Sequence, residues 1–123
     1  MLPLKAEGSR MSQASAEILR GTLDLLILKA LSWGPAHGYA VARWIEQATN
    51  DALAIGEGTL YPALHRLEER GWIAASWGAS ENNRQAKFYA LTRRGRTQLR
   101  AEDANWRRYA AAVFAALEAP ALD

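Results

Sequence analysis

The stretch GEGTLYPALHRLEERGWI, residues 56–73, decides the fold. Leu60, Leu64 and Leu67 recur at intervals of four and three residues, and this spacing places them on one side of a helix. Gly71 predicts the end of that helix, because glycine readily adopts the left-handed backbone that often follows a helix C-terminus. Apolar residues then resume in the alternating pattern of a strand. The sequence therefore predicts a short helix that leads directly into a strand.

Two helices are expected before this stretch. Residues 17–34, EILRGTLDLLILKALSWG, carry a dense run of Leu and Ile, which predicts a helix buried on most of its surface. Residues 39–49, YAVARWIEQAT, repeat apolar side chains at helical spacing and predict an amphipathic helix. The third helix contains Pro62, which a first turn tolerates because the amides there lack intrahelical partners. We therefore expect the third helix to start at residues 57–59.

A hairpin and a long helix are expected after this stretch. Residues 72–78 and 86–92 each alternate between two faces as paired strands do, and the polar segment ASENNRQ joins them. Thr92 is a suitable N-cap for the final helix, because its hydroxyl can accept a bond from an unpartnered amide. The predicted fold is mainly α with a β-hairpin, in the order of a winged helix-turn-helix followed by a long C-terminal helix.

In a winged helix-turn-helix, the helix before the hairpin enters the DNA major groove. The leucines of that helix turn to the core and leave a chemically mixed face outward. On this face His65 and Arg66 could bond to base edges, and Tyr61 to a phosphate or a thymine methyl group. Pro62 lies on the same face, with Thr59 and Tyr61 at its edges. The alternative is an ordinary solvated surface, which the glutamates of this helix favour.

A basic run follows the first strand of the hairpin. Residues 82–101 contain six cations and no acidic residue, namely Arg84, Lys87, Arg93, Arg94, Arg96 and Arg100. Arg84 and Lys87 would lie on the hairpin, whereas Arg93 and Arg94 would lie in the first turn of the final helix. Cations are unfavourable in that turn because the helix dipole is positive there. We therefore predict that the run contacts DNA phosphates, with a solvated basic surface as the alternative.

The final helix carries a seam whose members alternate steps of four and three residues. This is the spacing of a helix that packs along another helix. The seam consists of Leu99, Asp103, Trp106, Ala110, Val113 and Leu117. One helix extending from a small domain cannot cover this stripe alone, so we expect a second copy of the chain to cover it. The expected divisions are a flexible arm at residues 1–15, a DNA-binding domain at residues 16–91 and a dimerisation helix at residues 92–119.

Composition limits the classes of function. The chain has 123 residues and no cysteine, which fits one domain without disulfides or thiolate metal sites. Its net charge of +2 is too small to indicate nucleic-acid binding by itself. His37 and His65 have no carboxylate cluster nearby in sequence, so we expect no enzyme, metal or cofactor, and we assign His37 to a turn or to packing. No apolar run reaches the roughly 20 residues of a membrane span, and we expect a cytoplasmic protein.

The chain contains the segments GTLDLLILKALSWGPAHGYAVARWI, EGTLYPALHRLEERGWI and KFYALTRRG. Together they resemble the PadR-type transcriptional regulators, a family named for a repressor of phenolic acid decarboxylase. The motifs that are specific in combination are HGY at residues 37–39, TLYPAL with RLE at residues 59–68, and YALT with a later glycine at residues 89–95. The resemblance extends over residues 19–117, which is nearly all of the chain outside the arm.

This resemblance implies a homodimeric winged helix whose final helix is the dimerisation arm. Two reading helices related by a two-fold axis predict a palindromic operator, and we expect the protein to be a repressor. It also places Trp106 where relatives carry a tryptophan that faces a central pocket. Two interpretations of Trp106 are open, namely packing within the dimer interface or one wall of a cleft for a small aromatic ligand. A winged helix that binds protein or RNA instead of an operator is the alternative for the whole chain.

Overall fold

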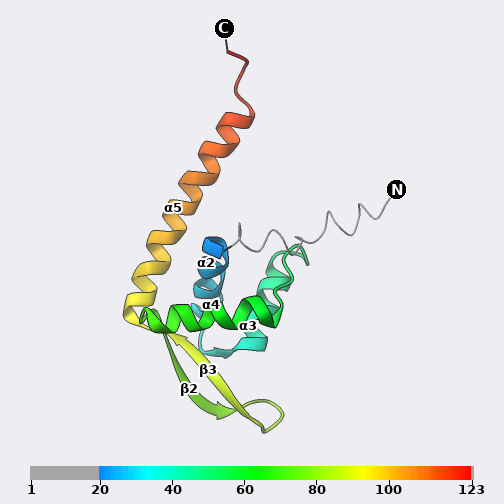
Figure 1. Cartoon of the computed structure of the whole chain (residues 1–123), viewed down its shortest axis with the longest axis vertical. Helices are drawn as coiled ribbons and strands as arrows, with labels where there is room; N and C mark the ends of the chain where they lie inside the picture. The colour runs from blue at the N-terminus through cyan, green and yellow to red at the C-terminus, as the bar shows by residue number, and fades with distance from the viewer. Residues whose placement is uncertain (1–19, 123) are drawn as a thin grey trace, which may run out of the picture.

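The computed structural model describes residues 20–122, and its elements follow the expected order of helices, hairpin and long helix (Figure 1). They are α2 (Arg20–Leu31), β1 (Ala36–His37), α3 (Gly38–Ala48), α4 (Glu57–Glu69), β2 (Ile73–Ala79), β3 (Gln85–Leu91) and α5 (Arg93–Leu117). The prediction of a mainly α winged helix-turn-helix with a long C-terminal helix is confirmed. The predicted arm, residues 1–15, lies outside the described residues.

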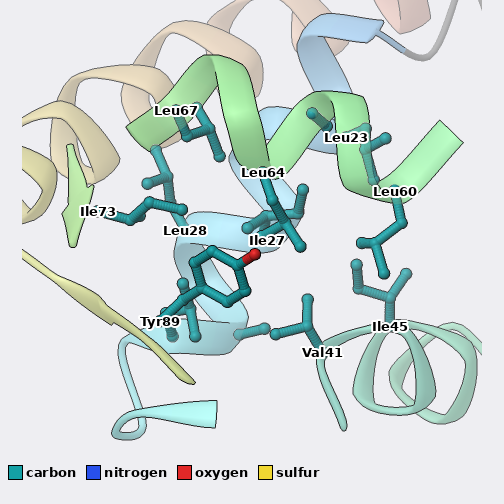
Figure 2. Packing of buried hydrophobic residues seen from close by; sticks show 13 residues of the cluster. Leu23, Ile27, Leu28, Val41, Ile45, Leu60, Leu64, Leu67, Ile73 and Tyr89 are labelled. Carbon is teal, nitrogen blue, oxygen red and sulfur yellow. The ribbon is translucent and has the colours of Figure 1, made fainter. Parts of the chain in front are cut away.

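The core lies where α2, α3 and α4 meet the base of the hairpin (Figure 2). Its largest fully buried side chains are Ile27, Leu28, Leu31, Val41, Ile45, Leu60, Leu64, Leu67 and Ile73. The three leucines of α4 that were predicted to face inward are therefore buried. α2 contacts α3, α4 and α5, which explains why its Leu and Ile run is so dense. Truncation of a buried leucine to alanine lowers the stability of a protein by about 2–5 kcal/mol. The strong preference of these leucines for the core keeps the opposite face of α4 turned outward.

The sheet contains the predicted hairpin and a third, very short strand. β2 and β3 pair antiparallel, with Ala75 opposite Tyr89, and β1 pairs with the other edge of β3, with His37 opposite Phe88. β1 was not predicted, because two residues are too few to show a periodicity. At the hairpin tip, Asn83 has a φ of 61°, a left-handed conformation that asparagine tolerates better than most residues.

α4 begins at Glu57, within the predicted range, and Gly56 is its N-cap. Pro62 is the sixth residue of the helix, so the expectation that it lies in the first turn was wrong. The helix continues without the amide of Pro62, and the carbonyl of Gly58 is left without its usual i+4 donor. At the other end, the amides of Gly71 and Trp72 donate to the carbonyls of Glu68 and Leu67 at 3.0 and 3.1 Å. This double closure needs the φ of +77° at Gly71, and the predicted helix end is confirmed.

Thr92 caps α5 as predicted and also ties this helix to the end of α4. Its Oγ1 accepts a hydrogen bond from the amide of Gly95 at 3.0 Å and donates one to the carbonyl of Gly71 at 2.7 Å. Gly95 is buried, and a Cβ atom there would lie 1.9 Å from the carbonyl oxygen of Trp72. α5 therefore leaves the hairpin base in a fixed direction, and its C-terminal half extends beyond the rest of the fold (Figure 1).

Candidate DNA-binding surface

The outward face of α4 carries exposed side chains over most of its length. Tyr61, Pro62, His65 and Glu69 are exposed, and Thr59 is half-buried at the edge of this face. The Nε2 atom of His65 lies 3.2 Å from a carboxylate oxygen of Glu69, one helical turn later. Both side chains remain about two-thirds exposed in this contact. The face is therefore accessible, and it offers hydroxyl, imidazole and carboxylate groups to a partner.

Arg66 does not share this face, contrary to the prediction. Its Nη2 atom donates to Oδ1 of Asp24 at 3.0 Å, so the guanidinium turns back toward α2. The side chains of Arg66 and Asp24 are 32% and 12% exposed. Arg66 directly precedes the buried Leu67, which places it at the border between the two faces of α4. A long side chain at that border can reach either side, and here it pairs within the protein.

Asp24 is the single buried charged or polar residue among residues 21–122, and sequence analysis missed it. Burial raises the pKa of this carboxyl above 3.8, and the nearby charge of Arg66 opposes the rise. The sequence did contain a signal for a buried carboxyl, namely an acidic residue inside a run of Leu and Ile on a helix expected to be buried. A carboxylate in that setting needs a cationic partner, because an unpaired buried charge is very costly.

A groove of about 420 Å³ separates the distal half of the hairpin from the start of α3 and α4. Its lining includes the aromatic side chains of Tyr39, Tyr61 and Trp77 and the cations Arg84 and Lys87. The three aromatic side chains are exposed. Tyr39 and Trp77 were not predicted as residues of the DNA-binding surface. Trp77 falls on the same strand face as Ile73, which the alternating pattern assigns to the core. The hairpin extends past the core, so this face is buried at its base and open toward its tip.

The HGY and TLYP motifs meet beside this groove. A Cβ atom on Gly38 would lie 2.8 Å from the hydroxyl of Tyr61, so this glycine makes room for the tyrosine. His37 is the N-cap of α3, and its Nδ1 atom accepts a hydrogen bond from the amide of Ala40 at 3.2 Å. The ring of His37 also contacts the edge of Phe88, with centroids 5.5 Å apart. Of the two roles expected for His37, a turn or packing, the structure shows packing, and His37 lies in β1 as the N-cap of α3 rather than in a turn.

The basic run forms two separate groups rather than one surface. Arg84 precedes β3 and Lys87 lies within it, at the distal end, whereas Arg93 and Arg94 follow β3 at its base. A strand of seven residues separates these ends by roughly 23 Å. Lys87 Nζ lies 3.6 Å from a carboxylate oxygen of Glu68 on α4. Arg84 and Lys87 therefore belong to the groove, and the arginines of α5 form a second basic group away from it.

The seam of α5 is covered by the rest of the described chain only in its first half. Leu99, Asp103 and Ala110 are half-buried, whereas Trp106 is 42% and Leu117 74% exposed. The indole of Trp106 contacts α2, where Nε1 donates to the hydroxyl of Thr22 at 3.1 Å. Beyond this point the large apolar side chains exposed on α5 are Tyr109, Val113, Phe114 and Leu117.

The exposed face of α4 before the hairpin, the groove and the cations beside it define a winged-helix DNA-binding protein. The chain belongs to the transcriptional regulator PadR-like family, which it matches over residues 27–101. It is therefore a DNA-binding transcriptional regulator, and members of this family are regulators rather than enzymes. Within residues 20–122 no helix is both long and apolar enough to cross a bilayer. The same residues hold no group of three or more side chains suited to a metal.

Solved structures support this assignment. A PadR family transcriptional regulator from Eggerthella lenta is 33% identical, with a TM-score of 0.73 over 87% of this chain and 91% of that one. A transcriptional regulator from Clostridium thermocellum is 29% identical, with a TM-score of 0.72 over 79% and 94% of the two chains. A PadR-like transcriptional regulator from Bacillus cereus is 25% identical, with a TM-score of 0.73 over 85% and 99%.

Proposed function

We propose that the protein is a homodimeric repressor that binds a palindromic operator through the outward face of α4. The observation that carries this proposal is the exposed apolar stripe on the C-terminal half of α5, formed by Tyr109, Val113, Phe114 and Leu117. Such side chains on a helix that extends beyond its own domain favour pairing with a second α5. Pairing through the same surface on both subunits produces a two-fold axis, and this axis relates two copies of α4.

Two copies of α4 related in this way call for a palindromic operator. Each helix must meet the major groove on the same side of the duplex, so the half-site centres lie about 10 base pairs apart or at a multiple of that spacing. A dimer seated across such a site blocks other proteins from the same DNA. This occlusion is the physical basis on which we propose repression.

The DNA contacts are divided among three groups of residues. On α4 we assign base-edge and backbone contacts to Thr59, Tyr61, Pro62 and His65, because they lie on or beside the outward face. In the groove, Arg84 and Lys87 supply charge for phosphates, and Tyr39 and Trp77 supply aromatic surface for sugars and base edges. At the base of the hairpin, Arg93 and Arg94 add a general attraction for DNA, since they lie far from the groove.

Trp106 supports a proposed effector site at the dimer axis. Its indole nitrogen is held by Thr22, while the ring remains 42% exposed on the same side of α5 as the apolar stripe. Packing against the partner helix accounts for this exposure, and so does stacking with a small planar aromatic molecule between two such rings. A ligand there changes DNA affinity only by its preference between two dimer geometries.

The test combines mass measurement with DNA binding. Light scattering after size exclusion should give the mass of a dimer. A duplex of about 30 base pairs, enriched by the protein from a randomised library, should contain two inverted half-sites. Its affinity should fall steeply with salt, because each neutralised phosphate releases a counterion. A monomer that binds one half-site at full affinity would overturn the dimer. A protein that binds RNA or another protein, but shows no salt-sensitive binding to duplex DNA, would overturn operator recognition.

A further inference from the structure

The ion pair between Arg66 and Asp24 joins α4 directly to the central helix α2. It links residues 42 positions apart, at a distance of 3.0 Å. Asp24 is 9% exposed on a helix that is otherwise rich in Leu and Ile. Apolar residues of similar size often replace both members of a buried ion pair at no cost in stability, or with a gain, whereas removing one member alone is destabilising. Stability of the fold therefore does not by itself account for an acidic residue at this position.

The ion pair adds a directional constraint on the orientation of α4 to the apolar packing of this helix. Apolar contacts between the leucines of α4 and the core turn one face of the helix inward, but they are non-directional and have no preferred bond angle. A charge-assisted hydrogen bond has a preferred distance and angle. Arg66 directly follows His65 in sequence, so fixing the guanidinium of Arg66 on α2 also fixes where the outward face of α4 points.

We propose that Asp24 is a positioning residue for DNA recognition, which orients the outward face of α4 through Arg66 without touching DNA itself. This inference rests on the proposed role of that face in operator binding. α2 is itself tied to α5 by the hydrogen bond from Trp106 to Thr22, two residues before Asp24. The orientation of α4 is therefore linked through α2 to α5, the helix that is proposed to pair the two subunits.

A role of Arg66 in reading bases makes the opposite prediction. To reach a base, the guanidinium of Arg66 must leave Asp24, so the carboxylate would compete with DNA. Removing Asp24 would then free Arg66 and raise the affinity for the operator. If Asp24 positions α4 instead, removing it lowers the preference for the operator. The sign of the change in preference separates the two roles.

The experiment compares two duplexes of about 30 base pairs, one enriched by the wild-type protein from a randomised library and one of random sequence. Dissociation constants are measured at one salt concentration, and the preference is the ratio of the two constants. We expect Asp24→Leu to lower the preference about 10-fold, as the loss of one good base contact does. Asp24→Asn should stay within about threefold of wild type, because its Oδ1 atom can still accept from Arg66. This partial rescue would not occur if bulk at position 24 were all that mattered.

A double-variant cycle tests the connection between the two residues. Arg66→Met should lower the preference as Asp24→Leu does, and the double variant should lose no more than the more affected single variant. If Asp24→Leu does not fold, Arg66→Lys is compared with Arg66→Met. Lysine can still pair with Asp24 and should retain more of the preference, and equal losses would count against the proposal. Asp51→Asn is the control for charge, since it removes one negative charge from an exposed loop and should leave the preference unchanged.

Three results would overturn the positioning role. They are an unchanged or raised preference in Asp24→Leu, equal weakening on both duplexes, and losses that add in the double variant. A wild-type protein that enriches no duplex would instead overturn the proposed function, and the positioning role would fall with it. The two failures are distinguishable because the second appears before any variant is made.

Discussion

The indole nitrogen of Trp106 donates a hydrogen bond of 3.1 Å to the hydroxyl of Thr22, and so joins α5 to α2 across 84 residues of sequence. One edge of the ring is thereby committed to its own subunit, while 42% of the residue stays exposed. Packing and ligand binding were the two interpretations left open for Trp106. The hydrogen bond adds a third role, because it ties α5 to α2 and supports the direction in which α5 leaves the hairpin base.

The first prediction is that Trp106→Phe keeps the dimer but loosens this junction. Phenylalanine retains an aromatic ring and loses the donor, which leaves the partly exposed hydroxyl of Thr22 to water and costs about 0.5–1 kcal/mol. The cost is measured by urea unfolding and the dimer by light scattering. Planar aromatic compounds should quench the tryptophan fluorescence of the wild type more than that of the variant, which keeps the exposed Trp33 and Trp77. If no compound quenches the wild type, Trp106 is a packing residue and the effector site is wrong.

The second prediction concerns the apolar stripe of α5. Val113→Glu should convert the protein to a monomer at micromolar concentration, because it places a charge in the middle of the proposed helix pair. Ala115 lies two residues later, on the opposite side of the helix, and is exposed. Ala115→Glu is therefore the matched control and should leave the mass of the dimer unchanged. Dimers in both variants, measured by light scattering, would exclude this face as the interface.

The third prediction uses the close approach of Gly38 to Tyr61. A methyl group on Gly38 would lie 2.8 Å from the hydroxyl of Tyr61 and must displace this ring. Gly38→Ala should weaken operator binding about 10-fold, the loss expected for one recognition contact, and leave most of the stability intact. In Gly21→Ala, the added methyl group has no atom within 4 Å, so DNA binding should not change. Operator affinity equal to wild type in Gly38→Ala would remove Tyr61 from the DNA contacts.

The fourth prediction is a dependence of stability on pH that belongs to Asp24. Burial raises the pKa of its carboxyl above 3.8, against the opposing charge of Arg66. The folded protein therefore holds this proton more tightly than the unfolded chain does. The stability that the protonated Asp24 carboxyl contributes is complete below a pH of 3.8 and is lost as the pH rises through the folded-state pKa.

The measurement is urea unfolding of the wild type and Asp24→Asn between about pH 3.5 and about pH 7, the range in which a raised carboxyl pKa acts. The free energy of unfolding of the wild type, minus that of the variant, should fall as the pH rises. Taking the difference removes the titration of groups that both proteins share. A difference that grows with pH would mean that the attraction of Arg66 exceeds the cost of burial.

The sequence by itself determined the order of the elements, except for β1, and the inward face of α4. The spacing of Leu60, Leu64 and Leu67 requires one buried side of α4, and the burial of these leucines follows. Thr92 and Gly71 mark helix ends because capping depends on groups within a few residues along the chain. The hairpin follows for the same reason, since alternation is a local property of a strand.

Only the tertiary structure decided which partners the long and boundary side chains take. Arg66 lies between two faces of α4, and its guanidinium pairs with Asp24 because α2 lies within reach in the folded chain. Arg84 and Arg93 belong to one continuous basic run in sequence, yet a strand carries them to opposite ends of the hairpin. Periodicity describes neighbours along an element, whereas a charge or an indole is satisfied by whichever distant element the packing brings close.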